Sequence, residues 1–414
     1  MAASALTVLK NSNVRRWVLA RFASGSAVSM VRAAVLWDVY ARSQSLAYVG
    51  LLGLLSFIPS PILALTGGVA ADRFDRKRIV LGAQTIEWVC AVLLMLLAWS
   101  DGLPLALLIA LYVLNGSAIA FESPSRQAIL PGLAPKEDLA RAVTVMSTAH
   151  ALSFVSGPAM AGLLLASFGS HVAYGGAALL LALAWSFVAR VDIRRIERVG
   201  PPTSPFRSLL EGFVFLRANR LVLAAMTLDL FAVIFGGATA MLPVYADKIL
   251  HVGPRGYGIL AASLDAGAVL MSALLLILPP VERLGRAVVI GVLGYGGATI
   301  AFGLSRNIEL SIAMYVLVGF SDQLSVVARS ALVQLSTPDE LRGRVSAVNT
   351  VFILASNQLT LAESGFVAAL TSPTFAVVSG GIVVFFVTAL LLLLVPELYR
   401  MKPTPPGASH HSAS

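Results

Sequence analysis

Twelve stretches of 18 to 29 mostly apolar residues follow one another along this chain of 414 residues. A helix needs about 20 such residues to cross the hydrocarbon core of a bilayer, where every backbone polar group must be satisfied within the protein. The sequence therefore predicts an all-α integral membrane protein with twelve transmembrane helices. The predicted spans are residues 17–40, 46–70, 79–99, 104–125, 140–168, 171–190, 220–244, 255–279, 287–304, 308–328, 343–370 and 374–396.

Composition agrees with this prediction and excludes several other classes of protein. Hydrophobic residues make up 57% of the chain and charged residues 12%, whereas a soluble domain carries about 25% charged residues. The single cysteine, Cys90, cannot form an internal disulfide. The formal net charge is +9, but the basic residues are spread over loops between apolar runs, so no nucleic-acid partner is expected.

A repeated polar segment divides the chain into two halves. Residues 126–141 read RQAILPGLAPKEDLAR and residues 329–344 read RSALVQLSTPDELRGR, so an offset of 203 residues superposes Arg126 on Arg329. Internal repeats of this kind are typical of secondary transporters. We therefore predict two pseudo-symmetric six-helix bundles, residues 1–190 and 220–398, a cytoplasmic linker between them, residues 191–219, and a disordered cytoplasmic tail, residues 399–414.

The distribution of basic residues predicts the orientation of the chain in the membrane. Of the 30 Lys and Arg residues, 24 fall on one side of the predicted spans and four on the other. Cytoplasmic loops carry such an excess of positive charge. We therefore expect both termini in the cytoplasm, and we assign Arg126 and Arg329 to cytoplasmic loops.

The loop after the second span combines small, acidic and basic residues: Gly68, Asp72, Arg73, Arg76 and Lys77. Small residues allow two helices to approach closely, and the charges predict an interhelical network on the cytoplasmic face. The alternative is that the bases only follow the positive-inside rule. The spacing resembles the Gly-x-x-x-Asp-Arg-x-Gly-Arg-Arg/Lys signature of the major facilitator superfamily. This resemblance implies that the five residues act as a conformational latch.

The second half carries a reduced copy of this motif, and the chain departs from the family pattern at two positions. Glu282, Arg283 and Arg286 keep the charged core without the leading glycine, which predicts a weaker latch. Asp75 replaces the second glycine of the signature. Tyr112 stands where many proton-coupled members carry an arginine, so any proton coupling must use other acids.

A third motif lies in the fifth span, where Gly157, Pro158 and Gly162 resemble a Gly-Pro pattern of exporters that is associated with antiport. Pro158 removes a backbone hydrogen bond and the small face permits tight helix contact. The alternative is a kink with no role in the direction of transport. Residues 124–128, Pro-Ser-Arg-Gln-Ala, are similar to the branch that contains enterobactin exporters and macrolide efflux pumps. This resemblance implies a drug or siderophore exporter of a bacterial inner membrane.

Ionisable residues inside the predicted spans are further candidates, because a charge in hydrocarbon costs at least ~2.5–3.5 kcal/mol. In the family that the chain resembles, spans one, four, seven and ten line a central cavity for substrate or protons. The candidate cavity residues are Arg32, Tyr112, Asp229, Phe231, Tyr315 and Asp322. The alternatives are fixed interhelical ion pairs for the charged residues and packing for the aromatic ones. Outside this set, Glu87, His150 and Asp265 are interpreted as polar helix contacts, and Asp38 and Glu122 as residues that reach water from span ends.

These observations predict a secondary active transporter that exports small amphipathic molecules (a drug, a siderophore or a metabolite) by proton antiport with alternating access. The proton gradient would supply the energy, and no cofactor or metal is expected. No catalytic constellation or phosphate-binding loop is present in the sequence, so we do not expect an enzyme. The alternatives are an importer or lipid translocator on the same fold, or a non-transporting membrane scaffold or sensor. The expected partners are a small-molecule substrate and the lipid bilayer, and the chain is predicted to be a monomer.

Overall fold

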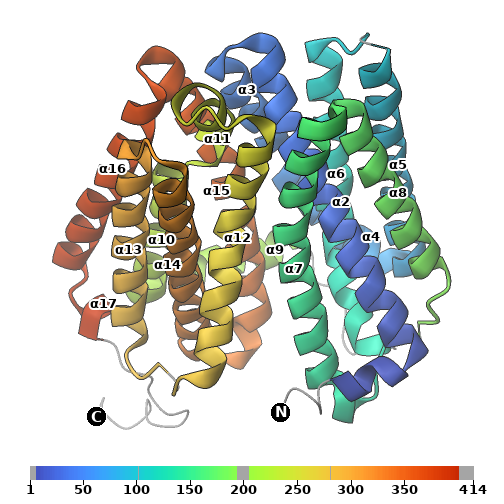
Figure 1. Ribbon diagram of the computed structural model, residues 1–414. Helices are drawn as coiled ribbons and strands as arrows, with labels where there is room; N and C mark the ends of the chain where they lie inside the picture. The colour runs from blue at the N-terminus through green and yellow to red at the C-terminus, as the bar shows by residue number, and fades with distance from the viewer. Residues whose placement is uncertain (1–5, 101, 194–204, 280, 401–414) are drawn as a thin grey trace, which may run out of the picture. The chain divides into compact units, whose positions relative to one another are not determined.

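The computed structural model describes residues 6–100, 102–193, 205–279 and 281–400 (Figure 1). Over these residues the chain is almost entirely helical and contains no β-strand. Twelve helical stretches are long and apolar enough to cross a membrane. The prediction of an all-α membrane protein with twelve transmembrane helices is therefore confirmed.

The first six spans extend from α2 to α8. The second of them is formed by α3 and α4 together, and the break falls before Pro59, which has no N–H to continue the hydrogen bonds of α3. The elements are η1 (Leu6–Lys10), α2 (Ser12–Ser43), α3 (Leu46–Phe57), α4 (Pro59–Arg73), α5 (Arg76–Trp99), α6 (Leu105–Ile129), η2 (Leu130–Gly132), α7 (Lys136–Phe168) and α8 (Ser170–Ala189).

The other six spans extend from α10 to α16. The seventh span is interrupted after α10 and continues through short helical turns to Ile249. The elements are α9 (Pro205–Ala218), α10 (Arg220–Gly236), η3 (Thr239–Met241), α11 (Leu242–Val244), η4 (Tyr245–Ile249), α12 (Gly253–Ile277), α13 (Leu284–Leu304), α14 (Ile308–Leu335), α15 (Asp339–Leu370), α16 (Pro373–Leu394) and α17 (Glu397–Arg400). The predicted linker contains α9 and otherwise lies partly outside the described residues, as does most of the predicted tail.

The chain forms two compact units. Unit 1 comprises Met1–Pro205 and Ala240–Asp265, and unit 2 comprises Phe206–Thr239 and Ala266–Ser414. Residues 240–252 and the first half of α12 thus group with the N-terminal helices, although they belong to the second half of the sequence.

The same helix neighbours recur in the two units, as expected for a duplicated half. In unit 1, α2 packs against α7 and α8, and α5 packs against α6 and α8. In unit 2, α10 packs against α15 and α16, and α13 packs against α14 and α16 (Figure 1). Each pair of packed helices in unit 1 therefore has a counterpart in unit 2, formed by the two helices at the same positions in the order of the other half. Each unit also has its own buried apolar cluster, which contains Trp17 and Ile129 in unit 1 and Val288 and Leu332 in unit 2.

Small residues bring α2 and α7 into close contact. The hydroxyl groups of Ser26 and Ser156 lie 2.9 Å apart, and the Ser29 hydroxyl donates to the Ser153 carbonyl at 3.1 Å. A Cβ atom at Gly157 would lie only 2.6 Å from the Ser26 carbonyl oxygen, so this crossing requires a glycine. Such small-residue contacts are the usual way in which helices associate inside a bilayer.

Candidate functional site

The predicted latch at the end of α4 ties several helix ends together. The Arg76 guanidinium donates to the Ala128 carbonyl of α6 at 2.8 Å and to the Ala71 carbonyl of α4 at 3.3 Å. The Lys77 ammonium donates to the carbonyls of Ala189 and Val191, both at 2.8 Å. Arg76 and Lys77 therefore satisfy backbone carbonyls at the ends of α4, α6 and α8, which have no partner within their own helices.

The other residues of the motif differ in exposure and packing. Asp72 and Arg73 are exposed at the end of α4. Gly68 is half-buried, and a Cβ atom there would meet nothing within 4 Å. Asp75 caps α5, because its carboxylate accepts a hydrogen bond from the Arg78 N–H at 3.0 Å. A latch function for this motif stays a prediction.

The second copy of the motif lies at the start of α13, where Glu282, Arg283 and Arg286 are exposed. The Arg286 guanidinium lies 5.7 Å from the ring centre of Tyr399 in α17. This distance allows a cation–π contact. The copy therefore contacts the end of the described chain, and its role as a weaker latch also stays a prediction.

The Gly-Pro motif of the fifth span contacts two different helices. α7 continues through Pro158 without ending. Gly157 faces α2, as described above, whereas Gly162 faces Gly258 in the first half of α12. A Cβ atom at Gly162 would lie 2.5 Å from the Gly258 Cα, and one at Gly258 would lie 2.7 Å from the Pro158 carbonyl oxygen. Only two glycines permit this backbone approach.

Unit 2 contains a buried interhelical ion pair. The Arg329 guanidinium of α14 lies 3.0 Å from the Asp229 carboxylate of α10 and donates to the Asn349 side-chain oxygen of α15 at 2.8 Å. The side chains of Arg329 and Asp229 are only 3% and 10% exposed. The pair matches the alternative expectation for Asp229, a fixed interhelical ion pair, and a paired carboxylate can still exchange a proton.

Tyr295 of α13 lies near several of the predicted cavity residues of unit 2. This buried tyrosine interacts electrostatically with Asp229, Asp322 and Tyr315. The hydroxyl of Tyr315 lies 3.2 Å from the Thr239 hydroxyl. Three of the predicted residues of unit 2 therefore interact with one tyrosine, which is not among the predicted cavity residues. Phe231 is 37% exposed and stacks on Phe235 with ring centres 5.9 Å apart.

The two predicted cavity residues of unit 1 also lie close together. Arg32 on α2 is half-buried and interacts electrostatically with Tyr112 on α6, which is buried. Arg32 interacts in the same way with Asp265, at the middle of α12. Asp265, which was interpreted from the sequence as a polar helix contact, is therefore an electrostatic partner of Arg32.

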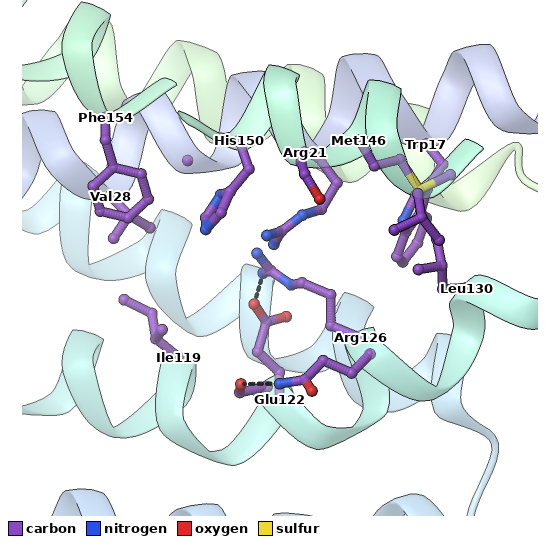
Figure 2. A pocket seen from close by; sticks show the side chains of 15 residues that line it. Trp17, Arg21, Val28, Ile119, Glu122, Arg126, Leu130, Met146, His150 and Phe154 are labelled. Atoms are coloured by element: carbon purple, nitrogen blue, oxygen red, sulfur yellow. Dashed lines mark hydrogen bonds and ion pairs between the residues drawn. The ribbon is translucent and has the colours of Figure 1, made fainter. Parts of the chain in front are cut away.

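A second charged group lies in unit 1 around a cavity of about 420 Å³ between α2, α6 and α7. Figure 2 shows the side chains of Arg21, Arg126 and His150 pointing toward one another in this cavity. Arg126 forms an ion pair with Glu122 one turn earlier on α6. The group therefore places two arginines, one carboxylate and one histidine around a single space.

The structure contradicts two interpretations of charged residues that were made from the sequence. Arg126 and Arg329 do not lie in loops, because α6 continues to Ile129 and α14 to Leu335, and most of each side chain is buried. Glu122 does not reach water, since it is 0% exposed and pairs with Arg126. In each case a partner of opposite charge inside the bundle makes burial possible, and hydropathy alone does not reveal this partner.

Asp38 also differs from its interpretation as a water-facing residue. It is 4% exposed, and its carboxylate accepts hydrogen bonds from the Ser170 hydroxyl at 2.6 Å and from the Tyr174 hydroxyl at 2.9 Å. Both donors belong to α8, so Asp38 ties α2 to α8.

Among the described residues, no group of three or more His, Cys, Asp or Glu side chains could hold a metal ion.

Comparisons with known proteins identify the family. Residues 17–357 match the Major Facilitator Superfamily. The chain is 28% identical over 409 residues to the enterobactin exporter EntS of Escherichia coli O1:K1 (97% of this chain and 96% of that protein), and EntS of Escherichia fergusonii gives the same values.

Solved structures share the fold at low sequence identity. A peptide transporter POT in complex with alafosfalin gives a TM-score of 0.71 at 15% identity, over 94% of this chain and 96% of that one. A D-xylose-proton symporter gives a TM-score of 0.69 at 13% identity, over 95% and 98%. The resemblance in the sequence motifs is thereby confirmed. The chain belongs to the Major Facilitator Superfamily and is a multi-pass membrane transporter rather than an enzyme.

Proposed function

We propose that this transporter exports small amphipathic molecules, siderophores first among them, by proton antiport with alternating access. The observation that carries the direction and the substrate class is the similarity to an enterobactin exporter, which extends over 97% of the chain rather than over one motif. We place the protein in the bacterial inner membrane with both termini in the cytoplasm, in keeping with the excess of Lys and Arg on one side of the spans.

The packing of unit 1 supports alternating access. The first half of α12 contacts α7 through Gly162 and Gly258, and the Tyr257 hydroxyl donates to the Ala33 carbonyl of α2 at 2.9 Å. Helices that meet through glycines have little interdigitation of side chains to undo. We propose that this contact closes one side of the transport path and separates once in each cycle.

The acids of unit 2 are the proposed proton carriers. Asp322 is half-buried on α14, and Asp229 is buried on α10. A carboxylate at such a position can take up a proton because its charged form is costly away from water. Proton uptake by either acid would change the charge next to Tyr295 and Arg329 and so favour one conformation over the other.

Secretion of enterobactin tests this function. In bacterial cells that lack their own enterobactin exporter, we expect expression of the chain to restore secretion and a protonophore to reduce it again. Asp322→Asn should slow secretion, because the amide cannot carry a proton, whereas Glu309→Gln, an exposed acid at the start of the same helix, should secrete at the parental rate. Secretion that stays at the level of the empty vector, at equal protein in the membrane, would exclude enterobactin as a substrate.

A further inference from the structure

The cavity of unit 1 has polar groups in its middle and apolar walls at its ends (Figure 2). Arg21 and Arg126 lie in the middle, with His150 beside them. The apolar side chains at the two ends are Val28, Ile119 and Phe154, and Trp17, Leu130 and Met146. A volume of about 420 Å³ falls in the range of small-molecule sites, which runs from about 300 to 1,000 Å³. The cavity therefore suits an amphipathic molecule with one polar group.

Hydrogen-bond donors outnumber acceptors around this cavity. Each guanidinium offers five N–H donors. Among the described residues, Arg126 donates only to Glu122 and, at 3.5 Å, to the Ser24 hydroxyl, and the Arg21 side chain makes no hydrogen bond or ion pair. Buried donors are normally satisfied. A molecule that supplies acceptors in this cavity would therefore satisfy these donors.

The carboxylates near the arginines satisfy only a small part of their hydrogen-bonding capacity. Glu122 is 0% exposed and occupied by Arg126. Glu87 on α5 interacts electrostatically with both arginines, but it does not line the cavity, and in the described structure neither of its oxygens has a hydrogen-bond partner. Around the cavity, two guanidinium groups, Arg21 and Arg126, therefore face a single carboxylate, Glu122, so an anion is favoured over a cation.

The first pair of equivalent positions in the two halves differs in charge. Asn11 caps α2 and Asn219 caps α10, in both cases through the side chain. Arg21 and Asp229 each lie ten residues after these caps. The same position on the helix therefore carries a cation in the first half and an anion in the second.

The second pair of equivalent positions is identical. α6 begins after Pro104 and α14 begins after Asn307, and Arg126 and Arg329 each lie 22 residues after these caps. In the second half, Arg329 is paired across helices by Asp229. In the first half, the residue at the place of Asp229 is a second arginine, and Arg126 is instead paired with Glu122 on its own helix, so the place of a partner carboxylate on α2 is taken by a cation.

We propose that the cavity between α2, α6 and α7 binds the negatively charged group of the exported molecule, with Arg21 and Arg126 as its ligands. This inference rests on the proposed export function and adds that the substrate is an aromatic or amphipathic anion, such as a carboxylate or catecholate. Arginine binds planar anionic groups through two parallel N–H bonds, which fixes their orientation. The aromatic side chains of Trp17 and Phe154 then contact the apolar part of the molecule.

Binding of a matched pair of probes to the purified full-length protein tests this site. Salicylate is an aromatic anion and salicylamide is its neutral analogue. We expect salicylate to bind the parental protein and to bind Arg21→Gln and Arg126→Gln at least about tenfold more weakly, because each loses a charge-assisted contact. Salicylamide should bind weakly and equally to all of them. Arg141→Gln, on an exposed arginine of α7 that pairs with Asp138, should bind salicylate like the parental protein.

Arg21→Asp separates loss of binding from loss of folding. This change reproduces the charge pattern of Asp229 and Arg329, so we expect the variant to fold at parental yield with its thermal midpoint unchanged or raised, and to lose salicylate binding. The proposal is overturned if the parental protein does not bind millimolar salicylate, or if Arg21→Gln, Arg126→Gln and Arg21→Asp bind it as tightly as the parental protein does. It is also overturned if salicylamide displaces salicylate from the parental protein as well as unlabelled salicylate does. Secretion of enterobactin by variants that bind no salicylate would overturn this inference alone, and arginine-dependent salicylate binding without secretion would overturn the export function alone.

Discussion

Replacing Asp229 with Asn is expected to lower the free energy of unfolding by about 3–5 kcal/mol, because it leaves the guanidinium of Arg329 buried without a counter-charge. The structure gives Arg329 a 3% exposed side chain and only one other polar partner among the described residues, Asn349. Water therefore has little access to replace the lost carboxylate. The measurement is the midpoint of thermal unfolding of the purified protein in detergent.

A double variant distinguishes the structural role of Asp229 from its proposed role in proton transport. Asp229→Leu with Arg329→Met removes both charges at similar volume, and such replacements are often neutral or stabilising. We expect this variant to unfold near the parental temperature but to show no proton-driven transport. If the double variant is stable and transports at the parental rate, Asp229 and Arg329 have only a structural role. Asp322 would then be the remaining proposed proton carrier.

Replacing Gly258 with Ala is expected to disfavour the contact between α12 and α7 by about 1–3 kcal/mol, the usual cost of overpacking. The added Cβ atom would lie 2.5 Å from the Gly162 Cα and 2.7 Å from the Pro158 carbonyl oxygen, which are backbone atoms and cannot rotate away. A cost of this size shifts the population of the closed contact about 5- to 150-fold. The transport rate of reconstituted protein should fall accordingly, because the cycle needs both conformations.

A second glycine provides the matched control. Gly116 lies on α6, and a Cβ atom there would meet nothing within 4 Å. Gly116→Ala should therefore be neutral or stabilise α6 by about 1 kcal/mol, since alanine favours a helix over glycine. If Gly258→Ala transports as fast as Gly116→Ala, the contact between α7 and α12 does not limit the cycle.

The sequence predicts the spans well because the bilayer leaves few choices. A run of about 20 apolar residues in hydrocarbon can satisfy its backbone only as a helix, and all twelve runs lie in helical stretches, with breaks in the second and the seventh. The repeat of Arg126 and Arg329 also identifies equivalent positions in the two halves. Their place inside helices could not be read from hydropathy, because an apolar run ends at the first charge whereas the helix continues.

The partners of the buried charges depend on tertiary contacts that the sequence does not specify. Asp229 meets Arg329 from another helix about 100 residues away along the chain, and Arg21 faces Arg126 in the same cavity. The approach of Gly162 to Gly258 likewise joins helices from different halves of the sequence. Small residues indicate that each helix can be approached closely, but not which helix approaches it.

The transport cycle that we propose requires the first half of α12 to separate from α2 and α7. Its most direct test is the distance between spin labels at Ala41→Cys and Arg255→Cys, two exposed positions on α2 and α12, in a protein whose buried Cys90 is replaced by Ala. A second pair, Ala41→Cys with Leu107→Cys on α6, serves as the control within the N-terminal helices. In proteoliposomes, we expect two distance populations for the first pair, whose ratio changes when a pH gradient is imposed, and one unchanged population for the control. A single distance for the first pair, unaffected by the gradient in protein that transports, would contradict this separation.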